Sequence, residues 1–180
     1  WIGSNGAGVY KYFSNKFIYY TKENGLPENY INAVSEDKFG NLWLALSSHG
    51  LAKINNSTIT TFERDKKNSP GLIDNNINAI LPMEDGTIYF GTDEGLFHFK
   101  DGKFLTLNDP IIKERYISCL YLDAKNKMWI GTNKGVLTLK DGVFTEETRV
   151  NSIGGTGIHI LILFVSEDKF GHMLIGTDNG

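Results

Sequence analysis

The sequence predicts an all-β protein made of repeated four-stranded antiparallel sheets, and three observations support this prediction. A short apolar phrase recurs five times along the 180 residues, most clearly as Met128-Trp129-Ile130-Gly131-Thr132. Its central residues are Trp1, Trp43, Tyr89, Trp129 and Leu174, spaced 42, 46, 40 and 45 residues apart. The spacings between the apolar and glycine positions inside a repeat are constant, and the length varies only in the segments that connect one repeat to the next. A period of roughly 40–50 residues built from short strand-like runs is typical of a β-propeller, in which each repeat forms one blade.

The first two strands of each repeat are predicted from an apolar residue twelve positions before each later central residue. These residues are Ile31, Ile77, Ile117 and Ile162. We expect first strands over 31–36, 77–83, 117–123 and roughly 158–167, and second strands around the recurring phrase, such as 42–47 and 128–132. Residues with turn chemistry lie between them, over 37–41, 84–86 and 168–171. This arrangement predicts a hairpin of two antiparallel strands.

The third and fourth strands are predicted from a glycine that follows the recurring phrase and an apolar residue nine positions later. We expect third strands over 51–55, 96–100 and 136–140, and fourth strands over 58–63, 103–107 and 143–147. Asp101-Gly102 and Asp141-Gly142 are two-residue hairpin signals. Asn55-Asn56 fills the same place in the second repeat, because Asn also tolerates positive φ.

The repeats divide the chain, residues 1–180, into three complete blades and two partial ones. The complete blades are expected over 29–63, 76–107 and 116–147, and the partial blades over 1–20 and 158–180. About four repeats make a partial ring or a fragment of a larger propeller, since closed propellers have roughly 4–8 blades. An open arc leaves edge strands that pair readily with another chain. We therefore expect either the remaining blades or a second copy, in a homodimer, to complete the arc.

Composition and charge exclude several classes of function. The chain is 41% hydrophobic and 12% aromatic, with a net charge of −3. This balance has no basic footprint for nucleic acid. Because no apolar run approaches the ~18 residues of a membrane helix, attachment to a membrane would require segments outside this sequence. The single Cys119 occupies the slot of Ala33 and Ala79, which predicts a small buried side chain.

The residues of the recurring phrase are interpreted as structural. Because their positions are fixed, we expect the side chains at 1, 43, 89 and 129 to pack between blades, each indole also needing one hydrogen bond. The glycines of the phrase, Gly91, Gly131 and Gly176, belong to the same structural set. The four histidines lie in different repeats without metal-ligand spacing, and no nucleophile or phosphate-loop motif is present. The sequence therefore predicts no catalytic residue, no metal site and no cofactor.

The ligand-binding residues are expected on one face of the arc. In a four-stranded antiparallel blade, the second-to-third turn and the crossover to the next blade lie opposite the other two turns. The crossovers also hold all the length variation, and loops on a rigid scaffold often carry binding sites. Aromatic and Arg side chains there could stack on a sugar and hydrogen-bond it, with ordinary polar loops as the simpler alternative. The candidates are Tyr30, Arg64, Arg115 and Tyr116.

Three stretches resemble the two-component regulator propeller repeat: residues 29–44, residues 76–90 followed by Gly91-Thr92, and residues 128–136 with their Trp-Ile-Gly-Thr-x-x-Gly pattern. The chain departs from this pattern where Tyr89 and Leu174 replace the Trp and where Ala45 replaces the Gly. The resemblance implies a periplasmic or extracytoplasmic sensor region of a hybrid histidine kinase and response regulator. It also implies detection of oligosaccharides during polysaccharide utilisation, as in Bacteroidetes.

Two other functional classes stay open on the sequence. The crossover loops would equally suit a protein-interaction propeller of a secreted or surface protein. A propeller lyase or hydrolase would need His and carboxylate side chains that converge near the central channel, and only His159 is a candidate for such a place. We expect this chain itself to bind a ligand and not to be an enzyme.

Overall fold

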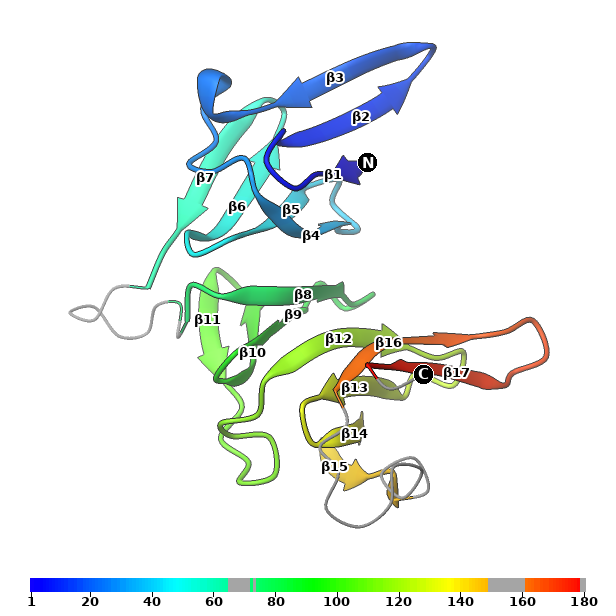
Figure 1. Cartoon of the computed structure of the whole chain (residues 1–180). Coiled ribbons are helices and arrows are strands. Elements are labelled where there is room, and N and C mark those ends of the chain that lie inside the picture. The colour runs from blue at the N-terminus through cyan, green and yellow to red at the C-terminus, as the bar shows by residue number, and fades with distance from the viewer. Residues whose placement is uncertain (65–71, 73, 149–160, 179–180) are drawn as a thin grey trace.

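The computed structural model describes residues 1–64, 72, 74–148 and 161–178 and shows an all-β architecture (Figure 1). In these ranges the strands form three four-stranded antiparallel sheets, preceded by a three-stranded sheet and followed by a two-stranded one. We number these sheets first to fifth in chain order. The predicted fold class, antiparallel four-stranded propeller blades, is confirmed.

The first and second sheets contain seven strands. The first consists of β1 (Ile2–Gly3), β2 (Val9–Phe13) and β3 (Lys16–Tyr20). The second consists of β4 (Ile31–Glu36), β5 (Leu42–Leu46), β6 (Gly50–Asn55) and β7 (Thr58–Phe62). The short 3-10 helix η1 (Lys22–Asn24), which the sequence did not predict, lies in the crossover between these sheets.

The remaining sheets repeat the same order of strands. The third consists of β8 (Ile77–Pro82), β9 (Ile88–Thr92), β10 (Gly95–Lys100) and β11 (Lys103–Thr106). The fourth consists of β12 (Ile117–Leu122), β13 (Met128–Thr132), β14 (Gly135–Lys140) and β15 (Val143–Glu146). The fifth consists of β16 (Ile162–Glu167) and β17 (Met173–Thr177). The expected start of the last first strand, residues 158–160, lies outside the described residues.

The third strands begin one residue earlier than predicted, at the glycine itself. Gly50 has φ +68°, and a Cβ on it would lie 2.2 Å from the backbone oxygen of Phe62. Only glycine adopts such a conformation without strain. The glycine therefore opens the strand instead of ending the preceding turn.

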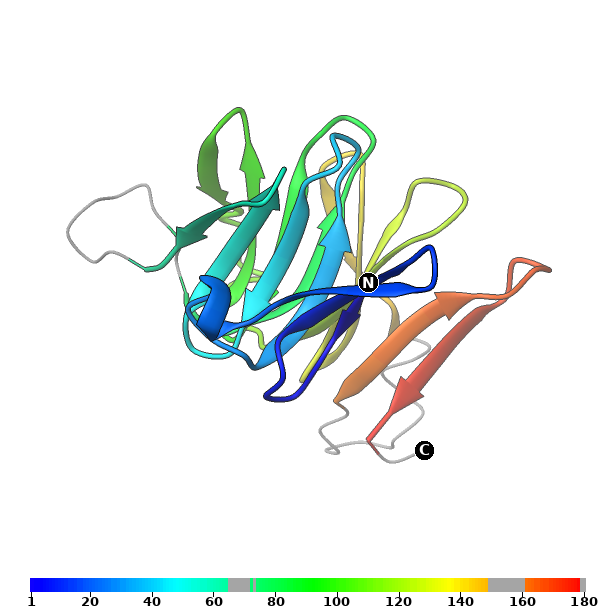
Figure 2. The same ribbon diagram turned by 90° about the horizontal axis from the view of Figure 1, so that it is seen from above.

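The first strands of neighbouring sheets lie side by side, and the sheets fan out from them (Figure 2). Each first strand carries a bulge just after its leading Ile. The bulge residue reaches the next sheet: Asn32 Nδ2 donates to the carbonyl of Ile77 at 3.1 Å, and Asn78 Nδ2 donates to that of Ile117 at 3.2 Å. Ser118 Oγ makes the equivalent bond to Ile162. Since bulges aim a side chain away from the regular ladder, they connect the second, third and fourth sheets to the sheet that follows each of them in the same way.

The central residues of the recurring phrase pack toward the following sheet. Trp43 is fully buried among Phe90, Phe97 and other side chains of the second and third sheets. Trp129 packs with Ile162 and Val165 of the fifth sheet. Tyr89 and Trp1 are only partly buried, at the equivalent junctions. The core of the molecule is therefore a series of apolar layers between sheets.

The glycines of the phrase allow this close packing. A Cβ on Gly91 would lie 2.5 Å from Cγ2 of Ile117, and one on Gly131 would lie 2.8 Å from Cγ2 of Ile162. Cys119 pairs with Gly131 across the ladder, in the slot of Ala33 and Ala79 as expected. Burial raises the pKa of its thiol. At Gly176 the close neighbour is the ring of Phe164 in the same hairpin.

No helix within the described ranges is long and apolar enough to cross a membrane.

Candidate ligand-binding face

The loops of the molecule gather on two opposite faces. The crossovers and the second-to-third-strand turns lie together, because Gly50 N–H donates to the carbonyl of Asn75 at 3.1 Å and Asn133 N–H to that of Tyr116 at 3.1 Å. We call this the crossover face. The first-to-second and third-to-fourth turns form the opposite side, which we call the hairpin face. All four residues predicted to bind a ligand belong to the crossover face.

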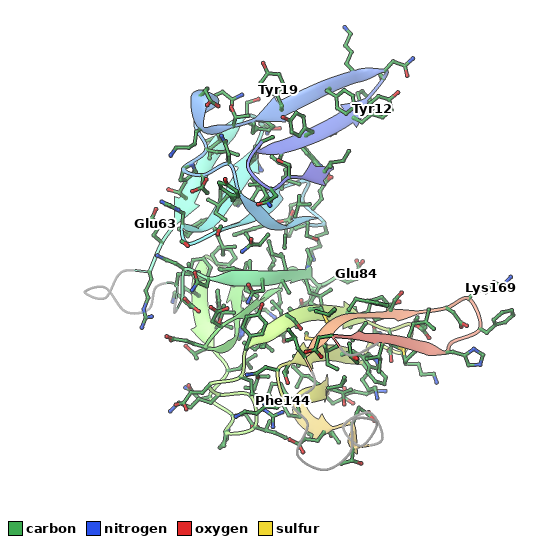
Figure 3. All side chains as sticks on the ribbon, in the orientation of Figure 1. Tyr12, Tyr19, Glu63, Glu84, Phe144 and Lys169 are labelled. Atoms are coloured by element: carbon green, nitrogen blue, oxygen red, sulfur yellow. The ribbon has the colours of Figure 1, made fainter. Side chains whose placement is uncertain are left out.

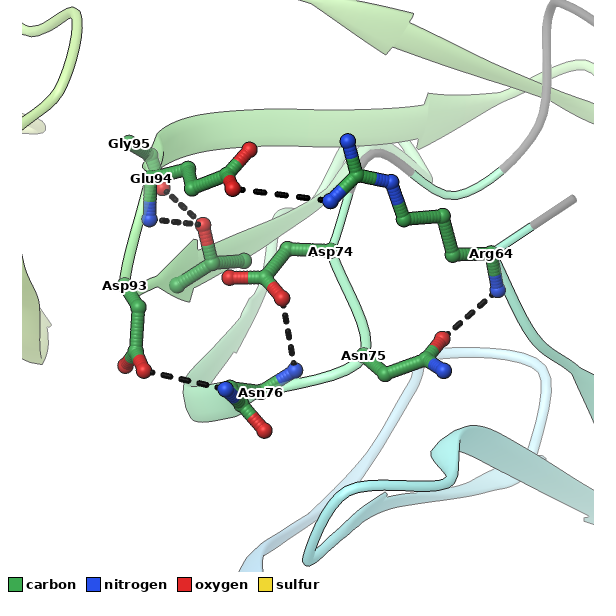
Figure 4. A network of polar contacts seen from close by, with 8 residues as sticks. Arg64, Asp74, Asn75, Asn76, Asp93, Glu94 and Gly95 are labelled. Atoms are coloured by element: carbon green, nitrogen blue, oxygen red, sulfur yellow. Dashed lines mark hydrogen bonds and ion pairs between the residues drawn. The ribbon is translucent and has the colours of Figure 1, made fainter. Parts of the chain in front are cut away.

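A polar network joins the second and third sheets on the crossover face (Figure 4). Arg64 donates from Nη1 to Glu94 Oε1 at 3.4 Å and from its backbone to Asn75 Oδ1 at 2.6 Å. Asn76 donates from its backbone to Asp74 Oδ1 at 3.0 Å. The other carboxylate oxygen of Asp74, a residue only 7% exposed, has no hydrogen-bond partner within the described ranges. The network is therefore ordered but incompletely satisfied.

Arg115 lies at the end of the next crossover. Its Nη2 is 2.5 Å from Glu146 Oε1, and its side chain is only 12% exposed. Its buried Nη1 has no hydrogen-bond partner among the residues that the structure describes. The backbone connects it to the Arg64 network, since Glu114 N–H donates to the carbonyl of Glu94 at 3.2 Å. A buried guanidinium with an unused donor favours an acceptor from a ligand, because an unsatisfied buried polar group is costly.

Tyr116 borders a hollow of about 500 Å³ between the fourth and fifth sheets. Burial, followed by the nearby charge of Asp93, raises the pKa of its hydroxyl, so the hydroxyl stays protonated at neutral pH. The other described lining residues are Asn133, Leu161 and Asp178. Oδ1 of Asn133 is buried without a partner. The hollow thus offers an aromatic ring, a neutral hydroxyl and a free acceptor.

The structure brings together some of the predicted residues and separates one. Arg115 and Tyr116 are neighbours in the chain, although only Tyr116 lines the hollow, and Arg64 connects to them through Glu94. Tyr30 occupies the position of Tyr116 two crossovers earlier in the chain, where its carbonyl accepts the N–H of Ser47. Its side chain is 49% exposed and its ring lies beside Gly6 of the first sheet. It therefore lies away from the hollow.

Sequence reasoning missed the polar residues of the second-to-third-strand turns. Asp93 accepts bonds from the side chains of both Asn76 and Asn78, and Asn133 and Asp178 line the hollow. A signal for them existed. Each directly follows the Thr of the recurring phrase, at a turn that strand order alone places on the crossover face.

The described histidines make local contacts. Nδ1 of His49 is 3.2 Å from the carbonyl of Ser47, and Nδ1 of His172 is 2.9 Å from Asp168 Oδ2. His98 contacts the ring of Tyr89, with centroids 5.5 Å apart. His159 lies outside the described residues. Within those residues, no three His, Cys, Asp or Glu side chains are placed to hold a metal ion.

The repeat pattern matches a known family in two of the blades. The family model described as two component regulator propeller matches residues 25–48 and 112–134. The chain carries two-component regulator propeller repeats.

Relatives of these propeller repeats include a kinase. The chain is 32% identical over 148 residues to "Histidine kinase P4" of Formosa agariphila. The matched region covers 79% of this chain and 10% of that protein. This chain therefore spans about a tenth of the length of that relative.

Solved structures share the fold. The extracellular domain of a hybrid two component system of B. thetaiotaomicron matches with a TM-score of 0.74 and 23% identity, over 98% of this chain and 23% of that one. Virginiamycin B lyase of Staphylococcus aureus matches with a TM-score of 0.63 and 14% identity, over 89% of this chain and 52% of that one. At such identities the likeness shows the propeller fold alone.

Proposed function

We propose that this chain belongs to the extracytoplasmic, ligand-sensing propeller of a two-component sensor and that its crossover face binds an oligosaccharide. The observation that supports the sensor assignment is the pair of matched regulator-propeller repeats in a chain 32% identical to a histidine kinase. The hollow beside Tyr116 supports the choice of a binding function. The kinase and response regulator would belong to the rest of the protein.

The hollow has the chemistry that a sugar needs. Oδ1 of Asn133, which lines the hollow and has no hydrogen-bond partner among the described residues, accepts from a sugar hydroxyl. The ring of Tyr116 offers an apolar surface for the C–H face of a sugar. Pockets that combine an aromatic wall with a few fixed polar groups are typical of small-molecule sites. A ligand there would change signalling only through its different affinity for two arrangements of the blades.

A binding screen tests this proposal. The chain is titrated with neutral oligosaccharides while backbone amide signals are followed by NMR. We expect shifts at Asn133 and Tyr116, and Tyr116→Ala should weaken binding at least about tenfold, as loss of a central aromatic contact does. Tyr30→Ala is the matched control, because it removes the equivalent Tyr away from the hollow. Shifts confined to other parts of the molecule, or equal losses in both variants, would contradict the proposed site.

We also propose that the outer surface of the first sheet is covered by a further blade or by a second copy of the chain. Its rings include Tyr12 and Tyr19, which are 58% and 56% exposed and point away from the second sheet (Figure 3). In the third sheet the positions of Tyr10, Tyr12 and Phe17 are held by Phe97, Phe99 and Phe104, which pack against the preceding sheet. Light scattering with chromatography tests the second-copy form of this proposal: a dimeric mass supports it, and a monomeric mass rules it out.

A further inference from the structure

Two grooves on the hairpin face occupy equivalent places in the repeat. One, of about 240 Å³, lies between the second and third sheets and is lined by Asp37 and Trp43. The other, of about 280 Å³, lies between the fourth and fifth sheets and is lined by Asp123 and Trp129. In both, the indole N–H donates to the Asp at 2.9 Å. The hydrogen-bonded Asp–Trp pair is therefore the same in both grooves, and the other lining residues determine which ligand each groove can bind.

The carboxylates in the groove between the fourth and fifth sheets are already engaged. Asp123 accepts two backbone N–H bonds at Oδ1 and the Trp129 indole at Oδ2. Oε2 of Glu167 accepts the backbone N–H of Ala124 at 3.0 Å. Their hydrogen bonds fix these negative charges at the edges of the groove, where they stabilise the hairpins.

The lysines that line this groove outnumber the carboxylates that line it. Lys127 is paired with Glu147 at 2.9 Å and lies 4.0 Å from the Trp129 ring centroid. Lys125 and Lys140 also line the groove, and neither forms an ion pair with a described carboxylate. Two cations without partners thus border one concave surface, which raises the local concentration of anions.

The groove between the second and third sheets lacks this excess. Lys100 is paired with Asp85 at 2.8 Å. Lys53 lies 5.5 Å from the Trp43 ring centroid, and Asp37 and Asp101 also line this groove, so that its two lysines face three carboxylates. The two grooves share size and the Asp–Trp pair but differ in charge, so each serves as a control for the other.

We propose that the groove between the fourth and fifth sheets binds a small organic anion, namely a carboxylate-bearing sugar ring. Lys125 and Lys140 hold the carboxylate, and the backbone of Gly171 and the side chain of Met173 bound the opposite wall. A volume just below the roughly 300–1,000 Å³ of pockets for drug-sized ligands suits a single ring. The negative charge follows from the lysines, whereas the choice of a sugar rests on the proposed function.

Titration with sodium glucuronate, with glucose as the neutral counterpart, tests this site. We expect glucuronate, but not glucose, to shift the NMR signal of the Trp129 indole N–H, while that of Trp43 stays unchanged. Each exposed charge contributes a few-fold in affinity, so the double variant Lys125→Met/Lys140→Met should bind roughly tenfold more weakly. Lys53→Met, in the groove between the second and third sheets, should bind as the unmodified chain does. Because Lys125 and Lys140 are exposed, the double variant should keep a folded spectrum.

Three results would overturn the assignment: equal shifts with glucose, unchanged affinity in the double variant, or equal shifts at Trp43 and Trp129. The proposed function is read separately from the same spectra, at Asn133 and Tyr116 on the opposite face. Neutral oligosaccharides that shift those residues without any glucuronate effect at Trp129 would reject the anion site alone. A glucuronate effect at Trp129 without any shift at Asn133 and Tyr116 from neutral oligosaccharides would support the anion site and reject the hollow as a binding site.

Discussion

The second and third sheets build the same hairpin with different side chains at its base. Asp37 and Met83 hold equivalent places, because each donates its backbone N–H to the residue four positions later, at 2.9 and 2.8 Å. Six residues further on, the second sheet has Trp43, bonded to Asp37, and the third has Tyr89. The carboxylate is therefore present where an indole N–H must be satisfied and absent where the ring needs no partner. In the second sheet the Asp and the Trp therefore form one structural unit, whereas in the fifth sheet Asp168 holds the same place before Leu174 and accepts the backbone N–H groups of its turn.

The largest effect expected at these hairpins is the loss of the buried ring itself. Trp43→Ala should lower the free energy of unfolding by about 3–5 kcal/mol, because it empties a fully buried site among Phe62, Phe90 and Phe99. Tyr89→Ala should cost roughly half as much, since that ring is only partly buried. Urea denaturation followed by circular dichroism measures both. Equal losses would mean that the two junctions depend equally on their central residue.

The next effect concerns the small residue two positions after the ring. Gly91→Ala should cost about 1–3 kcal/mol, because its Cβ would lie 2.5 Å from Cγ2 of Ile117. The second sheet already has Ala45 at this position, and Ala45→Gly should cost only about 0.5–1 kcal/mol. In the background of Ile117→Ala, Gly91→Ala should cost less than in the unmodified chain, since the clash has been removed. A cost that adds fully in the double variant would show that the strain lies in the backbone.

A third prediction compares how substitutions at Asp37 and at Met83 change stability as a function of pH. Burial of Asp37 opposes its ionisation, but hydrogen bonds from Trp43 and Asn41 outweigh it, and the net effect lowers the pKa of Asp37 below its ordinary 3.8. A lowered folded pKa adds stability that is complete above the unfolded pKa and is lost as the pH falls through the folded value. Asp37→Asn should therefore cost about 1–3 kcal/mol at neutral pH.

The pH dependence provides the control for this variant. The difference between Asp37→Asn and the unmodified chain should shrink as the pH falls below about 4, because protonation removes the same charge. Met83→Leu, at the equivalent position, should lower stability by the same amount at every pH. Urea midpoints recorded across the pH range test both, and a difference for Asp37→Asn that stays constant with pH would show that the charge plays no part.

Much of the fold could be predicted because the repeat is rigid. The offsets from Ile117 to Trp129, and from Trp129 to Gly135, reflect strand pairs with fixed hydrogen-bond registers, so sequence spacing translates directly into structure. The position of the acidic residue within the first hairpin of the third sheet could not be predicted from spacing in this way. Asp85 resembles Asp37 in sequence, but it lies two places later in the hairpin and bonds Thr87 instead of a ring.

The candidate site was less accessible from sequence, because it depends on contacts between crossovers of different length. The position of Arg115 and Tyr116 at the end of a crossover predicted their face correctly. Their proximity to Asn133 depends on the tertiary bond between its N–H and the carbonyl of Tyr116. The charge difference between the two hairpin-face grooves likewise appears only once Lys125 and Lys140 are brought to one wall.

The smallest effect expected in this comparison lies in the ion pair that the third sheet has at its hairpin. The pKa of Asp85 is lowered to about 2, mainly by its hydrogen bond from Lys100 and then by the hydrogen bond from the backbone N–H of Thr87. Because the pair is exposed, Lys100→Met should leave the urea midpoint within the scatter of repeated measurements. The pKa of Asp85, followed by NMR of its carboxyl carbon, should nevertheless rise toward the ordinary 3.8. If it stays near 2, the turn backbone alone sets the acidity of Asp85, and this hairpin would then resemble that of Asp37 in its electrostatics although it lacks the indole.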